Sequence, residues 1–267
     1  MILSKEILLI IIAIAIVCLI GFKRYIWFIS IGYGLSIATI GIILLVLYKD
    51  TLNYAYVISC IILICYGFRL GGFLALRELK NKTYIKKMKN EIKDGSNMNL
   101  VIKSVIWISC VLLYFMMCSP TIYRFANNSG IDIFFILGLI VAAVGVIIEI
   151  IADWQKTSQK KEKPNRFCSK GLYKIVRCPN YFGELVLWSG VFISGITALE
   201  GVGQWVIAIL GFVGIIYVMF SGARRLEIRQ DKCYSENEEY KKYIKNTPII
   251  IPLLPLYSVK KYWWFVS

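Results

Sequence analysis

The chain has 267 residues, of which 58% are hydrophobic, and its mean hydropathy is +0.66. These values exclude an ordinary soluble domain, because the apolar residues come in blocks of about twenty with few charges inside them. The net charge of +15 comes with no nucleic-acid-binding motif. Basic loops beside a membrane with anionic lipids would explain this charge, and a polyanionic cofactor is the alternative.

Seven segments are long and apolar enough to cross a bilayer as helices. The first could be mistaken for a signal peptide, but it has no small-residue cleavage site and a second apolar segment follows at once. We therefore predict an all-α, multi-pass membrane bundle of about seven transmembrane helices. The predicted spans are roughly 6–22, 26–47, 53–70, 101–119, 131–152, 182–198 and 202–221.

The positions of the basic residues predict the orientation of the helices. Of 31 Lys and Arg residues, 8 lie in residues 77–103, 8 in 153–180 and 9 in 221–267. Cytoplasmic loops of membrane proteins carry such an excess of Lys and Arg. We expect the N-terminus outside and the C-terminus in the cytoplasm, in the cytoplasmic membrane of a bacterium.

The residue types that are missing exclude several kinds of enzyme. The chain has no histidine, and its eight cysteines are scattered without a CxxC pair. Because histidine is the commonest metal ligand and the usual general base, we predict no metal site, zinc hydrolase or His-containing triad. The phosphate-binding motifs GxGxxG and GxxxxGK[ST] are also absent. A nucleotide site would have to be built from helices and loops at the membrane surface.

Four charged residues share one helical face at the end of the fifth apolar segment. Glu149, Asp153, Lys156 and Lys160 follow one another at i, i+4, i+7 and i+11. Glu149 lies about one turn inside the apolar run, where desolvating a carboxylate against lipid costs several kcal/mol. We therefore expect Glu149 to face the bundle interior or a wet cavity. The alternative is an amphipathic helix end with snorkelling lysines.

A second polar face is predicted in GLYKIVRCPNYFGE, residues 171–184. Pro179 fits the first turn of a helix, so Asn180 and Glu184 follow on one side of it. Arg177, Asn180 and the free backbone N–H groups at this helix N-terminus suit a phosphate or another anion. Alternatively, Asn180 and Glu184 only cap the helix and pair with Arg177.

Four stretches resemble, in order and spacing, the C-terminal domain of the steroid 5-alpha-reductase family, including its bacterial members of unassigned substrate. They are EIIADWQK, GLYKIVRCPNYFGELVLWSG, RRLE and EEYKKYIKNTPIIIP. The resemblance covers about 145–255 and is weaker at YGFRLGGFLALR. It implies a seven-helix membrane enzyme that binds NADPH from the cytoplasmic side and reduces a carbon–carbon double bond conjugated to a carbonyl. It divides the chain into 1–130, on the substrate side, and 131–267, with the cofactor site and a cytoplasmic tail.

The same resemblance implies which positions bind the cofactor. Many relatives read Arg-His-Pro-Asn where this chain has Cys178 in place of the histidine, which puts one polar contact to the cofactor in doubt. Three more arginines are candidates, beside Lys160, for the 2′-phosphate of NADPH: Arg224, Arg225 and Arg229. The implied cofactor-binding residues are Glu149, Asp153, Lys160, Arg177, Asn180, Glu184 and Tyr243.

The implied catalytic residues are Tyr66 and Arg69, which resemble a Tyr-x-x-Arg pair of the steroid reductases. There the tyrosine bonds the substrate ketone and polarises the enone while hydride reaches the β-carbon. Tyr66 could instead be an interfacial aromatic residue, with Tyr33 or Tyr56 as the acid. Those reductases also carry a glutamate in an early helix, whereas residues 7–77 contain no Glu. Steroid, polyprenal, sterol-like and 2-enoyl lipid substrates therefore all stay open.

Two other classes of function compete with the reductase. Isoprenylcysteine carboxyl methyltransferases share an Arg-His-Pro-x-Tyr motif and bind S-adenosylmethionine at a comparable place. The upstream Glu-x-x-x-Asp-x-Gln-Lys and the downstream Tyr-x-x-Tyr-x-x-x-Thr-Pro of this chain favour the reductase. The third class is a non-catalytic lipid-binding or scaffold protein. The expected partners are a hydrophobic small-molecule or lipid substrate and membrane lipids; nothing indicates nucleic acid or a protein partner.

Overall fold

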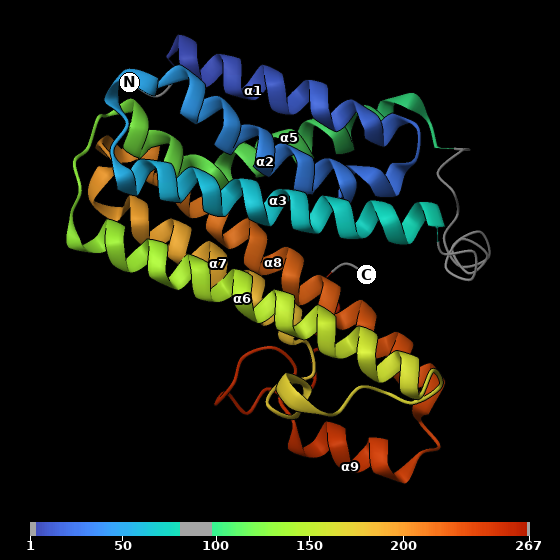
Figure 1. Cartoon of the computed structure of the whole chain (residues 1–267). Coiled ribbons are helices and arrows are strands. Elements are labelled where there is room, and N and C mark those ends of the chain that lie inside the picture. Colours follow the sequence, from blue (N-terminus) through green and yellow to red (C-terminus); the bar gives the residue numbers. More distant parts are fainter. Residues whose placement is uncertain (1–3, 81–97, 266–267) are drawn as a thin grey trace. The chain divides into compact units, whose positions relative to one another are not determined.

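The computed structural model describes residues 4–80 and 98–265, and within these ranges the protein is helical and contains no strand (Figure 1). Seven of the described helical segments are long and apolar enough to cross a membrane, which confirms the predicted all-α architecture of a multi-pass integral membrane protein. Much of the basic loop predicted at 77–103 lies outside the described residues. The seven segments are Lys5–Phe22, Tyr25–Leu47, Tyr54–Leu76, Leu100–Ala126, Ile133–Glu162, Pro179–Ala198 and Gly201–Tyr234.

The first of two compact units comprises residues 1–139 and 191–212. Its long helices lie side by side in Figure 1, and short 3-10 turns lie between α1 and α2 and between α2 and α3. Helices α2 and α3 approach closely because glycines face one another: a Cβ on Gly67 would lie 2.4 Å from the Gly34 carbonyl oxygen. The helices of this unit are α1 (Lys5–Cys18), α2 (Ile31–Leu47), α3 (Tyr54–Lys80) and α5 (Leu100–Ala126).

The second unit comprises residues 140–190 and 213–267. It holds most of α6 (Ile133–Glu162), α7 (Pro179–Gly195) and α8 (Gly201–Tyr234), with the short helix α9 (Glu238–Asn246) and the 3-10 turn η4 (Gly171–Lys174). Helices α6 and α8 continue past the predicted span ends at 152 and 221. The polar residues that follow each apolar run are mostly good helix formers, so the helix persists where the chain leaves the hydrocarbon.

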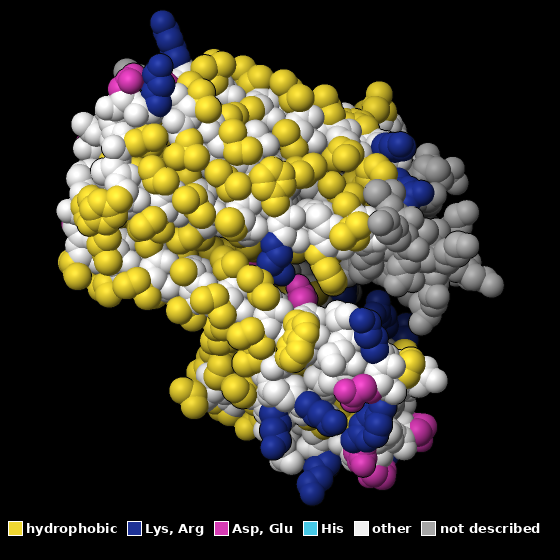
Figure 2. All heavy atoms as spheres, in the orientation of Figure 1, with side chains coloured by type: hydrophobic (Ala, Val, Ile, Leu, Met, Phe, Trp, Pro, Cys, Tyr) yellow, Lys and Arg dark blue, Asp and Glu magenta, His cyan; other side chains and the backbone are white. Residues whose placement is uncertain are grey.

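The outer helices expose large apolar side chains, as helices in lipid do. On α1, Ile7, Ile10 and Ile14 are buried, whereas Leu8 and Ile16 on other faces are 54% and 62% exposed. Figure 2 shows hydrophobic side chains over much of the visible face of the first unit. A helix that is apolar on all sides suits burial in a bilayer, where no face has to contact water.

A buried arginine stabilises one end of the first unit. Arg124, near the end of α5, is fully buried and donates from Nε to the Ser194 carbonyl (2.7 Å) and from Nη1 to the Gly130 carbonyl (2.7 Å). Its Nη2 lies 2.5 Å from Thr197 Oγ1 and 2.9 Å from Asp132 Oδ2. All three guanidinium nitrogens are therefore used within the protein, and Arg124 fastens the two loops that follow α5 and α7.

Helix α5 is longer than predicted, because it continues through Pro120 to Ala126 instead of ending near 119. A Cβ added to Gly195 would lie 2.3 Å from the Pro120 Cβ, so the proline ring packs against a position where only glycine fits. Proline is tolerated inside membrane helices where neighbouring groups satisfy the backbone around it.

Candidate functional site

The predicted helix start at Pro179 is confirmed, since α7 begins there. The residues just before it are paired with the C-terminal segment of the chain. The Arg177 N–H donates to the Pro248 carbonyl and the Cys178 N–H to the Ile249 carbonyl, both at 2.9 Å. These two backbone N–H groups, which precede α7, are therefore bound by the C-terminal segment.

Arg177 forms a buried ion pair that the motif alone did not predict. Its side chain is 1% exposed, and Nη2 lies 3.1 Å from Oε1 of Glu227, whose side chain is 4% exposed. The same Nη2 donates to the Tyr257 carbonyl. Glu227 is thus the residue that sequence reasoning missed, and its signal was one acidic side chain inside the basic stretch RRLEIRQ.

Two donors of Arg177 are left over. Its Nε and Nη1 are buried and have no hydrogen-bond partner within the described residues. Leaving buried donors of a charged group unsatisfied costs about 1–3 kcal/mol or more, so such groups call for an explanation. An oxygen acceptor on a bound molecule would satisfy them.

The neighbouring Cys178 is buried and carries no charge. Its side chain is 2% exposed, and burial raises the pKa of the thiol to about 12. The thiol is therefore protonated and neutral near pH 7. This position offers a ligand no charge.

Glu149 is buried against the start of α7. It is 2% exposed, and a Cβ on Gly183 would lie 2.8 Å from its Cγ and 2.9 Å from the Gly145 carbonyl oxygen. The two glycines let α6 and α7 approach so closely that Glu149 faces the interior of the second unit instead of lipid. Glu184 follows directly after Gly183 and is likewise buried, with 6% of its surface exposed.

Lys160 and Asp153 have different surroundings. Lys160 Nζ donates to the Arg166 carbonyl (2.6 Å) and to Tyr234 Oη (3.2 Å), so it closes the loop after α6 onto the end of α8. Lys160, a candidate for the 2′-phosphate, is thus already engaged by groups of the protein. Asp153 is half-buried on the same helix.

Two glutamines of α6 hold the loop that leads into the motif. Gln159 Oε1 accepts from the N–H groups of Ser169 (3.0 Å) and Lys170 (3.1 Å), and Gln155 Oε1 accepts from the Leu172 N–H (2.8 Å). Gln155 belongs to the stretch DWQK, whose spacing could have indicated it. These side chains place the start of GLYKIVRCPN against α6.

Tyr243 anchors α9 to the same loop. Its hydroxyl donates to the Tyr173 carbonyl at 2.6 Å, and its ring stacks on Phe167 with centroids 5.2 Å apart. Burial raises the pKa of both Tyr243 and Tyr173. The hydroxyl of Tyr243 is therefore a neutral structural donor.

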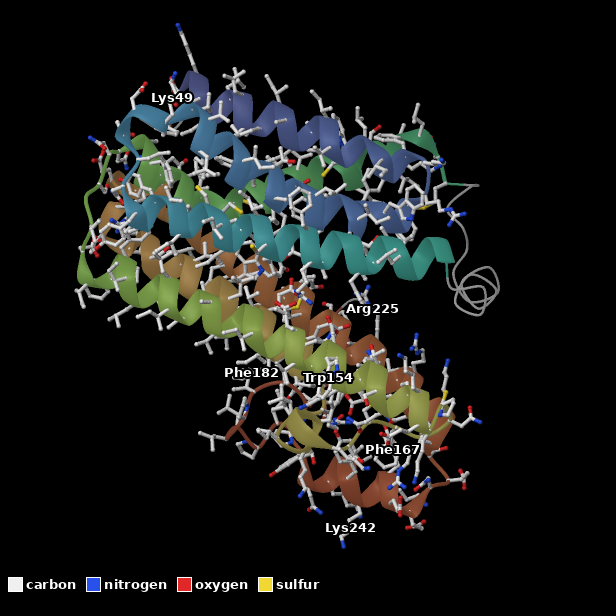
Figure 3. The ribbon with its side chains drawn as sticks, in the orientation of Figure 1. Lys49, Trp154, Phe167, Phe182, Arg225 and Lys242 are labelled. Carbon is white, nitrogen blue, oxygen red and sulfur yellow. The ribbon has the colours of Figure 1, made fainter. Side chains whose placement is uncertain are left out.

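The three candidate arginines of α8 differ in exposure. Arg224 donates to the Lys260 and Phe265 carbonyls, each at 3.2 Å, and so binds the C-terminal segment. Arg225, labelled in Figure 3, and Arg229 are exposed. Asn180, at the start of α7, is half-buried.

The candidate catalytic residues lie in the first unit. Tyr66 is fully buried, so it is not an interfacial aromatic residue, and its hydroxyl lies 2.9 Å from that of Tyr33. The Tyr33 ring stacks on Tyr114 at 4.9 Å, and the Arg69 guanidinium lies 5.9 Å from the Tyr66 ring centroid. Tyr56 instead donates to the Arg124 carbonyl in α5 and to the Ser129 carbonyl in the loop after it, which is a structural role.

Within the described residues, no group of three or more Cys, Asp or Glu side chains is placed to hold a metal ion.

Comparison with known proteins identifies the family. The family model described as "Protein of unknown function (DUF1295)" matches residues 17–247. The chain belongs to this family. No solved structure matches this DUF1295 chain.

Two curated relatives confirm the resemblance to steroid 5-alpha-reductases. Steroid 5-alpha-reductase DET2 of Gossypium hirsutum is 25% identical over 123 residues, which are 45% of this chain and 42% of the relative. Steroid 5-alpha-reductase DET2 of Arabidopsis thaliana is 36% identical over 58 residues, 21% of this chain and 22% of the relative. The DUF1295 chain thus matches less than half the length of each relative.

Proposed function

We propose that this DUF1295 member is a membrane-embedded reductase that uses NADPH to reduce a carbon–carbon double bond conjugated to a carbonyl in a hydrophobic substrate. The observation that carries the proposal is the charged interior of the second unit, where Glu149, Arg177, Glu184 and Glu227 are all buried. Ionisable residues inside membrane helices are costly and mark functional sites. They lie in the stretches that resemble steroid 5-alpha-reductases.

The residues of the second unit fit a nucleotide. The buried Nε and Nη1 donors of Arg177 suit a phosphate or amide oxygen, since charge-assisted hydrogen bonds are the strong ones. Glu184 would accept from a neutral polar group, and Arg225 and Arg229 would bind the 2′-phosphate. NADPH supplies the hydride.

Tyr66 is the proposed acid of the reaction. Its hydroxyl donates to Tyr33 Oη at 2.9 Å; with substrate bound it would turn to donate to the substrate carbonyl and accept from Tyr33, with the Arg69 charge near its ring. Tyr66→Phe keeps the ring and removes the donor. We expect turnover to fall by roughly 10²–10³, about 2.7–4 kcal/mol, with NADPH binding retained. Stopped-flow oxidation of bound NADPH by a conjugated enone measures this, and unchanged rates would remove Tyr66 from the mechanism.

Cofactor preference tests the proposal as a whole. Thermal unfolding of the detergent-purified protein is followed with NADPH, NADH and S-adenosylmethionine, because a ligand of the folded state raises its stability. We expect NADPH to bind roughly ten- to a hundredfold more tightly than NADH, about 1.5–3 kcal/mol. Equal affinities would contradict the proposed 2′-phosphate contacts, and preference for S-adenosylmethionine would favour a methyltransferase.

Two substitutions test the proposed site within the second unit. Asn180→Ala and Glu184→Ala should abolish NADPH binding and leave the protein folded. The matched control is Lys241→Ala, whose side chain pairs with Glu238 on the surface of α9 and should bind NADPH as the wild type does. Normal NADPH binding by the Asn180 or Glu184 variant would show that these residues only cap the helix.

The proposed topology places the N-terminus outside and the C-terminus in the cytoplasm of a bacterial cytoplasmic membrane. The substrate side lies in 1–130 and the cofactor site in 131–267, and the partners are a hydrophobic substrate and membrane lipids. Cys233, near the end of α8, is exposed and serves as a natural probe. A membrane-impermeant maleimide should label Cys233 only after cells are permeabilised. Labelling in intact cells would show that the C-terminus lies outside.

A further inference from the structure

The C-terminal strap, residues 248–265, follows a fixed path along α8. Tyr217 donates from its hydroxyl to the Trp264 carbonyl (2.7 Å), and Arg224 donates to two strap carbonyls. Glu227 Oε2 accepts from the Val259 N–H (2.9 Å) and the Lys260 N–H (3.0 Å). Three side chains of one helix thus hold the backbone of a segment that has little helix of its own.

The strap nevertheless turns large apolar side chains outward. Leu253 is 100% exposed and Trp263 77%, and Leu254, Tyr257 and Trp264 are between 41% and 50% exposed. Leu253 also has φ +67, a left-handed conformation that a leucine rarely adopts. A rigidly held segment that exposes this much apolar area to water would be unfavourable, so a nonpolar medium must contact it.

An open apolar pocket lies between α8 and the strap. Its volume is about 190 Å³, and no charged residue lines it. The strap, 248–265, forms one wall, and it contains two lysines and no acidic residue. The lining residues are Phe220, Leu256, Val259, Tyr262, Trp264 and Phe265.

Helix lengths place the strap at one boundary of the membrane. The seventeen residues of α7 and the turn after it form a 20-residue span, about 30 Å, which only just crosses the hydrocarbon. Its first residue, Pro179, therefore lies at an interface, and the strap is hydrogen-bonded to the two residues before it.

Helix α8 gives the same depth independently. Tyr217 and Phe220 follow the start of α8 at Gly201 by about 24 and 29 Å at 1.5 Å per residue. Their strap contacts, Trp264 and Phe265, lie at that boundary too. On α6, Trp154 is 69% exposed and follows Ile133, the first residue of the helix, by about 32 Å, which places it at the same boundary.

We infer that the C-terminal strap is a lipid-binding surface of the protein: its exposed leucines and aromatic residues insert at the boundary between headgroups and acyl chains, and its pocket takes part of an acyl chain. Trp and Tyr favour this depth, and an acid-free segment with lysines suits anionic headgroups. The inference is independent of the proposed reductase activity.

Spin labels on the full chain in lipid vesicles test the inference. The exposed Cys65 and Cys233 are replaced by serine, and a label is attached at Leu253→Cys or, as the control, at Lys242→Cys on the exposed face of α9. We expect the Leu253 label to collide more with oxygen than with a water-soluble nickel complex, and the Lys242 label to show the reverse. A Leu253 label that prefers nickel, or that is shielded from both, would overturn the inference.

Tryptophan quenching tests the pocket. The difference between the wild type and a Trp263→Phe/Trp264→Phe variant gives the emission of these two tryptophans. We expect lipids brominated near the headgroup end of the chain to quench this emission more than acrylamide does. Trp188, which is 2% exposed, is the control: its emission, obtained in the same way from Trp188→Phe, should be quenched by neither reagent. Strap emission that acrylamide quenches best, or that no reagent quenches, would show that water or protein covers the strap.

Discussion

Removing Glu227 should destabilise the second unit more than removing any surface charge. Its carboxylate accepts from Arg177 Nη2 (3.1 Å) and from the N–H groups of Val259 (2.9 Å) and Lys260 (3.0 Å). Glu227→Ala leaves the 1%-exposed Arg177 as a buried charge without its counterion. Breaking a buried ion pair on one side costs about 3–5 kcal/mol. For a chain of this size that is a fall in Tm of about 6–20 °C.

Thermal unfolding in detergent measures this change, and a double variant separates its causes. Arg177→Met/Glu227→Leu removes both charges and should recover much of the lost stability, because the uncompensated charge is gone. The matched control is Glu239→Ala, whose pair with Arg166 is exposed at 66% and 43% and should contribute little. A Glu227→Ala protein that melts within about 2 °C of the wild type would refute the reasoning, since that shift corresponds to less than about 1 kcal/mol.

Three further outcomes follow from the described contacts. Gly145→Ala should reduce the free energy of unfolding by about 1–3 kcal/mol and so lower the melting temperature, because its Cβ would lie 2.3 Å from a backbone nitrogen of α7. An unchanged melting temperature would contradict that helix contact. Burial would raise the Asp132 pKa, but hydrogen bonds and the Arg124 charge lower it overall. The ionised Asp132 therefore stabilises the folded protein fully above an ordinary aspartate pKa of about 3.9, and this contribution is lost as the pH falls through the lower pKa of the folded state. Acid unfolding of Asp132→Asn should lack this pH-dependent loss of stability. Tyr33→Phe should lower kcat and leave NADPH affinity unchanged in the stopped-flow assay, because it removes only the hydroxyl 2.9 Å from Tyr66; an unchanged kcat would show that Tyr33 does not orient Tyr66.

The sequence by itself determined the membrane architecture. Each span is one continuous apolar run, and lipid leaves the backbone no hydrogen-bond partner outside its own helix, so the helices could be read in order. Pro179 marked the start of α7 for a local reason, its missing N–H. The burial of Glu149 also followed from its place inside an apolar run.

Only the tertiary structure decided which groups meet. Arg177 pairs with Glu227, fifty residues later, and the N–H groups before α7 bind carbonyls at 248 and 249. No periodicity predicts such partners, because they depend on how α8 and the strap return past α7. The contact of Tyr66 with Tyr33 is of the same kind, since it depends on the glycines that bring α2 and α3 together. Helical spacing says which side chains share a face, whereas packing decides what that face touches.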